Sequence, residues 1–462
     1  MNKQERPRSP GHYGAIRRSL AKRLPDGLIL LSGAAPCRRN GDVEYPFRQS
    51  SDFLYVSGIP RPHCRILIDP RRGRETLFIP KIDDHYRIWL GNLPGPEEAK
   101  ALYGFERVFY NDRLPAVLKA QGRGYRKLYA DAESMKSVKA PKGLRPAKSE
   151  LRDALDEMRA VKTPGEVALL RKASEVSGLA HRAAMRSARA GLYEYEVQAV
   201  FEAECLRRGL KYLGYPSIVA SGKNAAVLHY QDNDAVLKDG DLLLIDAAAE
   251  ADGYSADITR TFPIGRRFGS RQRDIYALVL EAQKSSIDKA RPGFLAAELH
   301  LHSMRVIARG LKDLGILKGE ESALVEGGAT RLFYPHGIGH MLGLDVHDSL
   351  GGRKRCLPNP TKVPVRFNAR LEPNFVITIE PGVYFHQAIL SNPKIRRRYR
   401  SFVDFDKASE FLEVGGIRIE DDVVVRPEGP PLNLTDVPKE IAEIEAIRSE
   451  ALEPRAMADG VE

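Results

Sequence analysis

The chain has 462 residues, of which 43% are hydrophobic and 29% are charged. This balance is typical of a globular protein with an ample core and excludes a disordered or fibrous chain. The length predicts two domains, or one large domain with an appendage. The formal net charge of +11 would suit a nucleic-acid partner. However, the basic residues are dispersed apart from 396–398 and the terminal region, and no nucleic-acid-binding motif is recognisable. We therefore expect solvated surface charge and no nucleic-acid partner.

The four cysteines lie far apart and form no CxxC pair; they are Cys37, Cys64, Cys205 and Cys356. This spacing fits neither a zinc finger nor a dense disulfide framework, and it suits a reducing cytoplasm. The first residues are polar and basic, and no apolar run reaches 18 residues. We expect a cytoplasmic protein without a signal peptide or a membrane span.

Short apolar runs alternate with turns in the first part of the chain. Residues 28–31, 64–68 and 76–79 are predicted strands, with helical stretches between them. This pattern indicates a separate α/β domain. Residues 136–148 are rich in Lys and Pro and poor in large apolar side chains, so we place the domain boundary there, between domains 11–148 and 149–455.

A helix is predicted to open at Thr163-Pro164-Gly165-Glu166, where Thr163 is the N-cap, Pro164 is at N1 and Glu166 completes a capping box. It runs to about Ala188. The motif at 188–191 recurs at 290–293, an offset of 102 residues, and each copy joins two predicted helices through a Gly turn. The repeat is what a pseudo-twofold domain would leave, although helix-turn-helix pairs are common.

Two acidic residues stand in neighbouring β-prone runs, Asp246 in the first and Asp257 in the second, with an Asp-Gly break between. The pattern predicts an antiparallel hairpin. With a turn centred near Ala251 and Asp252, the two acids fall close to opposite one another. Two adjacent carboxylates repel unless one protonates or a cation lies between them. The segment is either a surface hairpin with chance acids or half of a metal site.

The other candidate ligands lie downstream. His336, His340 and His347 stand among glycines, Glu380 ends a β-branched run, and Glu420 follows Arg418 by two residues. Residues i and i+2 share a face of a strand, so Arg418 and Glu420 are predicted to point the same way. A lone strand Glu is usually solvated and a lone His is usually structural. Here, however, four strand or loop ends offer carboxylates and one His joins them.

The order Asp246, Asp257, His340, Glu380, Glu420 resembles the ligand order of the pita-bread metallopeptidases, and residues 44–53, 240–262 and 314–319 resemble aminopeptidase P. The resemblance covers roughly residues 11 to 445. It implies an α/β (α+β) fold, with a smaller aminopeptidase P-like amino-terminal α/β domain followed by a pseudo-twofold pita-bread metallopeptidase domain. A mainly oxygen-donor site favours two divalent ions of the Mn²⁺ type, with Zn²⁺ or Co²⁺ as alternatives.

The implied activity is the metal-dependent hydrolysis of an amino-terminal Xaa-Pro bond by a hydroxide activated between two metal ions. The resemblance makes Glu380 both a ligand and a proton shuttle, and it makes His229, His336 and His347 catalytic or substrate-binding. Further substrate-binding candidates lie elsewhere in the chain: Tyr215, Tyr384, Trp89, Arg366, Arg370 and Arg418. Trp89, the only tryptophan, either packs in a core or closes the substrate cleft. The expected substrates are peptides with Pro at the second position, and the expected assembly is a homodimer or homotetramer.

Three alternatives were weighed. The long connection at 385–413 resembles prolidases, which cleave only the dipeptide Xaa-Pro, so an Xaa-Pro dipeptidase stays open. Metal-free binding modules and creatinase-type hydrolases share the fold but lack these ligands, whereas all five are kept here.

Overall fold

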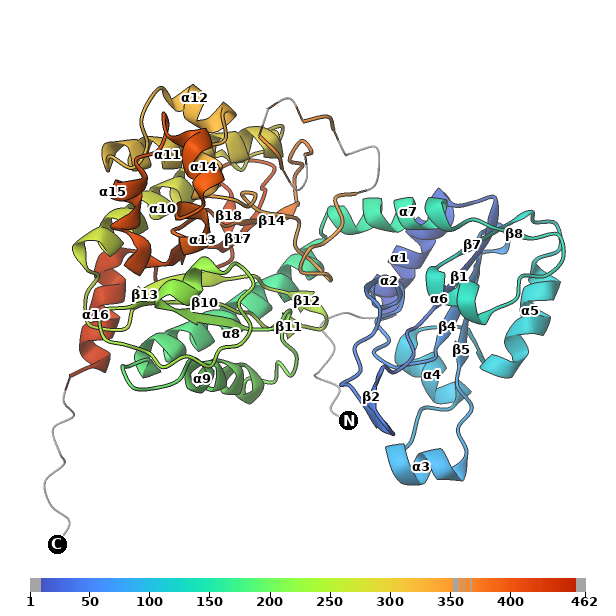
Figure 1. The fold of residues 1–462 in the computed structure, drawn as a ribbon. Helices are drawn as coiled ribbons and strands as arrows, with labels where there is room; N and C mark the ends of the chain where they lie inside the picture. The colour runs from blue at the N-terminus through green and yellow to red at the C-terminus, as the bar shows by residue number, and fades with distance from the viewer. Residues whose placement is uncertain (1–9, 352–356, 360, 362, 366–367, 454–462) are drawn as a thin grey trace, which may run out of the picture. The chain divides into compact units, whose positions relative to one another are not determined.

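The computed structural model describes residues 10–351, 357–359, 361, 363–365 and 368–453. The chain forms two compact units, coloured blue to teal and teal to red in Figure 1. The first runs through Arg159 and the second begins at Ala160. No helix among the described residues is long and apolar enough to cross a membrane.

The first unit contains a six-stranded sheet with the strand order β6-β5-β4-β1-β7-β8. All six residues of β1 are buried, because α5 packs on the face that carries Leu28 and Leu30, and α1 and α2 lie on the other side (Figure 1). The predicted strands are confirmed as β1, β4 and β5. The elements are α1 (Pro10–Arg23), β1 (Gly27–Ser32), β2 (Arg38–Asn40), β3 (Val43–Glu44), α2 (Ser51–Ser57), β4 (Arg65–Asp69), β5 (Arg74–Ile79), α3 (Asp84–Leu90), α4 (Pro96–Tyr103), β6 (Arg107–Tyr110), α5 (Leu114–Gln121), β7 (Lys127–Ala130), α6 (Ala132–Ser137), β8 (Arg145–Pro146) and α7 (Lys148–Ala160).

Helix α7 belongs with the first unit, so this unit ends at Arg159 rather than near Lys148. The Tyr55 hydroxyl donates to the carbonyl of Met158 at 3.1 Å. Arg159 pairs with Asp52 at 2.8 Å. These contacts tie the end of α7 to α2, which the composition of the preceding Lys- and Pro-rich segment does not reveal.

The second unit opens with the predicted capping box. The Thr163 hydroxyl accepts from the Glu166 amide at 3.3 Å, and the Glu166 carboxylate accepts from the Thr163 amide at 2.8 Å. The other carboxylate oxygen of Glu166 accepts from the Tyr254 hydroxyl at 2.8 Å. Through this bond the first turn of α8 (Pro164–Ser187) holds the hairpin that carries the two acids.

Two helix pairs repeat in the second unit, as the 102-residue offset predicts. The first pair is α8 with α9 (Glu194–Arg207), and the second is α10 (Ser270–Lys289) with α11 (Ala296–Asp313). Strands follow each pair. The strands and remaining helices are β9 (Ile218–Ser221), β10 (Leu242–Asp246), β11 (Glu250–Ala251), β12 (Tyr254–Ser255), β13 (Thr259–Pro263), α12 (Glu321–Glu326), β14 (Val376–Ile379), β15 (Gly382–Tyr384), α13 (Gln387–Leu390), α14 (Pro393–Tyr399), α15 (Phe405–Ser409), β16 (Gly416–Arg418), β17 (Asp421–Val424), β18 (Leu432–Asn433) and α16 (Ile441–Ala451).

The acid-bearing hairpin forms, but its register differs from the prediction. Asp246 lies opposite Thr259, not Asp257. The turn is centred on Asp252 and Gly253, which both have positive φ, at 48° and 83°. An Asp-Gly pair in this conformation makes a two-residue hairpin turn, so the turn lies one residue later than predicted. Asp257 precedes Thr259 by two residues and keeps the same face, so both carboxylates still point the same way.

Glu380 and Glu420 come from two short antiparallel pairings in the second half of the unit. Strand β14 pairs with β17, and β15 pairs with β16. Glu380 directly follows β14. Glu420 lies between β16 and β17 and forms a bridge to Thr259, which brings this half of the unit against the acid-bearing hairpin.

Candidate metal centre and active site

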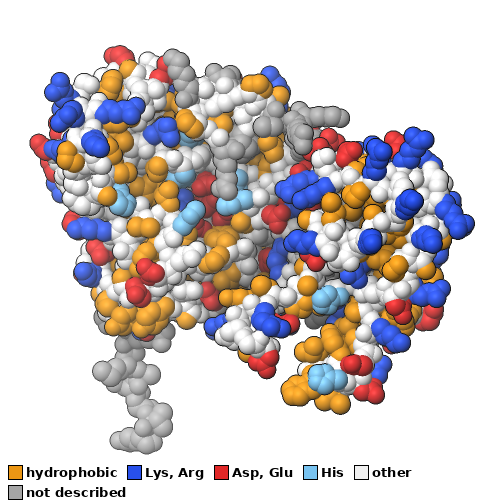
Figure 2. All heavy atoms as spheres, turned by 45° about the vertical axis from the view of Figure 1, so that its right-hand side comes forward, with side chains coloured by type: hydrophobic (Ala, Val, Ile, Leu, Met, Phe, Trp, Pro, Cys, Tyr) orange, Lys and Arg blue, Asp and Glu red, His pale blue; other side chains and the backbone are white. Residues whose placement is uncertain are grey.

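Five predicted ligands meet in one buried cavity of about 120 Å³ in the second unit. Its wall also includes three of the predicted histidines, and Figure 2 shows acidic and histidine side chains gathered in a hollow of this unit. The lining residues are Leu228, His229, Asp246, Asp257, His336, Gly337, Gly339, His340, His347, Glu380, Arg418 and Glu420. Residues from Leu228 to Glu420 therefore converge at one point.

The tightest part of this cluster is made by Asp257, His340 and Glu420. One ligand atom from each lies within 4.8 Å of the others. His340 Nε2 lies 3.3 Å from Asp257 Oδ2 and 3.6 Å from Glu380 Oε1. The other ring nitrogen, Nδ1, donates to the carbonyl of Met341 at 3.0 Å. A backbone acceptor on one nitrogen fixes the ring and leaves the other as a ligand.

The acids of the cavity are held in an unfavourable environment for negative charge. Burial, followed by the charges of neighbouring acids, raises the pKa of Glu420 well above its ordinary value. Burial and Asp257 raise the pKa of Glu380 to about 7. Burial alone would lower the pKa of His340, but the hydrogen bond to Asp257 and the charge of Glu380 raise this pKa to about 8.

A further carboxylate oxygen of the cavity is available as a ligand. Asp246 Oδ1 is buried and has no hydrogen-bond partner among the described residues. Its other oxygen accepts from Arg418 at 2.5 Å. An unsatisfied buried carboxylate oxygen is costly, and a bound cation would satisfy it and relieve the repulsion between the acids. The residues present therefore fit a divalent cation held mainly by oxygen, with one imidazole.

Arg418 links the acids to the histidines. Its guanidinium donates to Asp246 Oδ2, to the Thr259 hydroxyl at 3.0 Å and to the Tyr384 hydroxyl at 2.9 Å. The Tyr384 hydroxyl lies 2.8 Å from His336 Nε2, and His336 Nδ1 lies 2.9 Å from the carbonyl of Gly337. Because that carbonyl can only accept, Nδ1 carries the proton and Nε2 accepts from Tyr384. Burial and the charge of Arg418 lower the pKa of His336 to about 3, which keeps this imidazole neutral.

The family models identify the fold that carries this site. The model of metallopeptidase family M24 matches residues 168–427, and that of the aminopeptidase P amino-terminal domain matches residues 13–129. The chain belongs to metallopeptidase family M24.

Named relatives agree with the family. A probable Xaa-Pro aminopeptidase from Talaromyces marneffei is 36% identical over 413 residues, covering 88% of this chain and 89% of the relative. Zn-substituted Escherichia coli aminopeptidase P in complex with product matches with a TM-score of 0.83 and 33% identity, covering 97% of this chain and 100% of that one. An aminopeptidase from Pseudomonas aeruginosa matches with a TM-score of 0.83 and 35% identity, covering 96% and 99%. The predicted family and fold are confirmed, and the chain is a metallo-aminopeptidase with a divalent-metal site.

The remaining candidate catalytic and substrate-binding residues lie in different parts of the site. His229 and His347 are exposed on the cavity wall, and the His347 ring meets the His340 ring edge-on at 4.3 Å. Tyr215 donates a hydrogen bond to Asp257. Tyr384 contacts Arg418 and His336 as described.

Two described substrate-binding candidates, Arg370 and Trp89, do not line this cavity. The Arg370 guanidinium donates to the carbonyl of Gly293 at 3.0 Å. Trp89 lies on α3 in the first unit and is 73% exposed, so the core-packing alternative is wrong. Arg366 lies outside the described residues.

Sequence reasoning missed two threonines that hold the ligands. The Thr259 hydroxyl donates to Glu420 Oε2 at 2.7 Å. The Thr378 hydroxyl accepts from the His340 amide at 3.1 Å and lies 3.4 Å from Glu380 Oε1. Each threonine stands two residues from a ligand in a strand or its extension, so the period of two that paired Arg418 with Glu420 would have found both.

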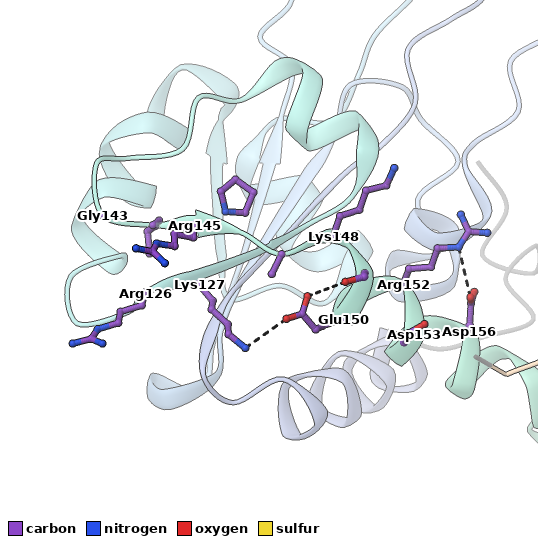
Figure 3. Close-up of a pocket in the computed structure, with 13 residues that line it drawn as sticks. Arg126, Lys127, Gly143, Arg145, Lys148, Glu150, Arg152, Asp153 and Asp156 are labelled. Carbon is purple, nitrogen blue, oxygen red and sulfur yellow. Dashed lines mark hydrogen bonds and ion pairs between the residues drawn. The ribbon is translucent and has the colours of Figure 1, made fainter. Parts of the chain in front are cut away.

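A larger groove, of about 1270 Å³, lies in the first unit but has different chemistry (Figure 3). It contains no histidine and none of the predicted site residues. Two of its carboxylates are paired with cations, Glu150 with Lys127 at 3.5 Å and Asp156 with Arg152 at 3.6 Å. Size alone would select this groove, whereas the unsatisfied oxygen of Asp246 and the perturbed pKa values of Glu380 and His336 select the smaller cavity.

Proposed function

We propose that this M24 peptidase is an Xaa-Pro aminopeptidase, which removes an amino-terminal residue that precedes proline. The observation that carries the proposal is the buried Asp257–His340–Glu420 cluster beside the unsatisfied Oδ1 of Asp246, in a chain whose relatives bear this name over most of their length. The aminopeptidase prediction is supported, and the dipeptidase alternative is not favoured.

The long connection that suggested a dipeptidase has a structural explanation. It folds into α13, α14 and α15, and its residues Val403, Phe405 and Phe411 are buried in the hydrophobic core. Arg396 in α14 pairs with Asp406 in α15 at 2.9 Å. None of its described residues lines the cavity, so this segment provides no cation there to hold the free carboxylate of a dipeptide.

We expect Asp246, Asp257, His340, Glu380 and Glu420 to hold two divalent ions, with Mn²⁺ favoured by the oxygen-rich donor set and Zn²⁺ or Co²⁺ as alternatives. Such ions polarise the scissile carbonyl and lower the pKa of water at the site. Asp246 Oδ1 is a buried acceptor without a hydrogen-bond partner in the described part of the chain, and Arg418 and Thr259 hold Asp246 and Glu420 in position.

The other residues have proposed roles in binding and proton transfer. Glu380, with its pKa raised to about 7, would take the proton of the attacking water on a carboxylate oxygen and deliver it to the leaving proline nitrogen. His229 and His347, exposed on the wall, would donate to the developing oxyanion. His336 is kept neutral and would position substrate through Tyr384.

Several finer predictions stay predictions. Tyr215, Tyr384 and Arg418 are expected to shape the proline-binding wall. Trp89 is expected to close the substrate cleft, and Arg366 or Arg370 would hold a substrate carboxylate. We also expect a cytoplasmic homodimer or homotetramer with no nucleic-acid or membrane partner.

Hydrolysis of Ala-Pro, Ala-Pro-Ala and Ala-Ala-Ala by the purified protein tests the proposal. We expect chelation to abolish activity, Mn²⁺ to restore it, and only Ala-Pro-Ala to be cleaved rapidly. Cleavage restricted to Ala-Pro would instead establish a dipeptidase. Full activity of metal-free protein would rule out the metal site as the catalytic centre.

A further inference from the structure

His229 is held at the cavity by its backbone alone. Its imidazole has no hydrogen-bond partner among the described residues, and it is exposed. It lies in residues 222–235, which connect β9 to the segment before β10 and contain little regular structure beyond a short 3₁₀ turn at Gly222–Ala226. Because a loop of this length has many conformations, the position of His229 depends on what anchors the loop. We call residues 222–235 the His229 loop.

A buried carboxylate anchors the loop on both sides of His229, whereas the side chain of Asn233 holds only the end of the loop, through bonds with Val219, Gln198 and Ser217. Glu194, the first residue of α9, is 0% exposed. Its Oε1 accepts from the Ser221 amide at 2.6 Å, from the Ser221 hydroxyl at 2.7 Å and from the Asn224 side-chain amide at 3.3 Å. Its Oε2 accepts from the Tyr230 hydroxyl at 2.8 Å and from the Ala235 amide at 3.1 Å.

These five donors span the whole loop. Ser221 immediately precedes it, Asn224 lies near its start, Tyr230 directly follows His229, and Ala235 ends it. The backbone adds one more bond, from the Glu194 amide to the carbonyl of Ala235 at 2.9 Å. An ionised carboxylate has only acceptor sites and can satisfy several donors at once, so one side chain fixes the beginning, the middle and the end of the loop.

We propose that Glu194 is a positioning residue for catalysis, which sets the place of His229 through the His229 loop. The inference rests on the proposed aminopeptidase function for its effect on rate, but not for its effect on loop order. Glu194 does not line the cavity and therefore acts only through the loop. A donor to the oxyanion must be held close to its productive position, and a displacement of about 1 Å can cost on the order of a hundredfold in rate.

The chain offers a matched control on the same helix. Glu204 Oε1 pairs with Arg208 at 2.5 Å, and its Oε2 lies 3.9 Å from Arg207. It is also a paired glutamate of α9, but neither partner belongs to the His229 loop. Glu194→Gln and Glu204→Gln therefore make the same chemical change in two places, and only the first removes acceptors from the loop.

Two measurements on the full-length protein test the proposal. In hydrogen exchange, Glu194→Gln should speed the exchange of amides in 222–235, whereas Glu204→Gln should leave them at the parent rate. In hydrolysis of Ala-Pro-Ala, Glu194→Gln should lower kcat/KM by about 10- to 100-fold, mainly through kcat. In a His229→Ala background the same change should have no further effect on kcat/KM, because the residue it positions is gone.

The outcomes separate the two levels of inference. An unchanged exchange rate, or the same loss of kcat/KM in both backgrounds, would overturn the positioning role. An inactive parent protein would overturn the proposed function, while the exchange result would still report the anchor. A fully active His229→Ala variant would overturn the role of His229 and with it the positioning role of Glu194 in catalysis. If Glu194→Gln does not fold, Tyr230→Phe removes one of the five bonds, and we expect faster exchange around residue 230 with a two- to tenfold loss of kcat/KM. Unchanged exchange and activity in that variant would also refute the proposal.

Discussion

Glu420 and Asp421 are adjacent in the chain and both are buried, yet their surroundings are opposite. Glu420 faces Asp246, Asp257 and Glu380, and burial together with these acids raises its pKa well above the ordinary value. Asp421 accepts from Arg260 at 2.7 Å, from Lys439 at 2.5 Å and from Asn433 at 2.7 Å. Although burial opposes it, the charges of Arg260 and Lys439 lower the pKa of Asp421.

The difference follows from the alternation of side chains along an extended chain. One side of the segment carries its own cations and needs nothing further. The other side has more acids than the single Arg418 compensates, and it is the side that lines the cavity. Buried cations pair with Asp421 but not with Glu420, and this arrangement suits the binding of a metal cation beside Glu420. The predictions below test this contrast.

The largest effect is expected at Glu380, on the uncompensated side. Glu380→Gln should lower kcat by roughly 10²- to 10⁴-fold, since it removes the proton acceptor. When a chelator has removed the metal, the free energy of unfolding of the variant should equal or exceed that of the parent, because burial and Asp257 disfavour the ionised form of Glu380. Steady-state hydrolysis and denaturant unfolding measure the two quantities.

The control for this variant is Glu410→Gln, an exposed glutamate paired with Arg271 at 2.9 Å, which should keep the parent rate. Metal content, measured on both proteins, separates a lost ligand from a lost proton acceptor. A Glu380→Gln protein that retains near-normal turnover would remove Glu380 from the mechanism.

The same contrast shows how far the sequence reaches. The ligands lie in runs whose residue types and order are visible, so Asp246, Asp257, His340, Glu380 and Glu420 could be named before the structure. The period of two placed Arg418 with Glu420, and both contact Thr259. The predicted turn of the hairpin was wrong by one residue. Several residues around Asp252-Gly253 could centre the turn, and only the positive φ angles show which pair does so.

Other features depend on tertiary packing that no local pattern encodes. Glu194 is an unremarkable acid in the first turn of a helix, a common place for acids because of the helix dipole, and only the fold brings Ser221, Tyr230 and Ala235 to it. The end of the first unit at Arg159 likewise depends on the distant partner Asp52. Trp89 shows the converse, since its exposure contradicts the usual preference of tryptophan for a core.

On the compensated side, Asp421→Asn should destabilise the protein by about 3–5 kcal/mol, because it leaves buried Arg260 and the Lys439 ammonium without their carboxylate. Asp422→Asn is the matched control. The donors to Asp422 are the neutral Ser174 hydroxyl at 2.8 Å and the Asp257 amide at 3.2 Å, so its replacement leaves no buried cation without a carboxylate, and we expect a smaller loss. Denaturant unfolding of chelated protein measures both, and equal losses would contradict the contrast.

The buried imidazole of His300 differs from both carboxylates, because it avoids a buried charge by staying neutral. His300, on α11, packs edge-on against Tyr334 with ring centroids at 5.4 Å, and burial lowers its pKa from 6.5 to about 4. The unfolded chain therefore binds a proton that the native protein does not. The stability from His300 is complete above pH 6.5 and is lost as pH falls from 6.5 to about 4, a change on the order of 3 kcal/mol.

His300→Phe should remove this contribution to the pH dependence of unfolding. The control is His302→Gln on the same helix, where the imidazole is less buried and lies 3.0 Å from the Ser285 hydroxyl. Its removal should change the slope less. Unfolding free energies measured from pH 7 to pH 4 decide, and an unchanged slope in His300→Phe would show that this histidine is already protonated in the native protein.

The smallest effect is expected where solvent, rather than the protein, compensates the charge. Glu150 pairs with Lys127 at 3.5 Å in the groove of the first unit, and the two side chains are 46% and 45% exposed (Figure 3). Water screens such a pair, and holding two long side chains together costs entropy, so exposed pairs contribute little. Glu150→Gln should shift Tm by less than about 2 °C and leave kcat/KM unchanged, and the shift should vanish at high salt. A shift as large as that of Asp421→Asn would mean that the exposed pair contributes as much to stability as the buried one. Burial would then not be the property that separates the two kinds of carboxylate.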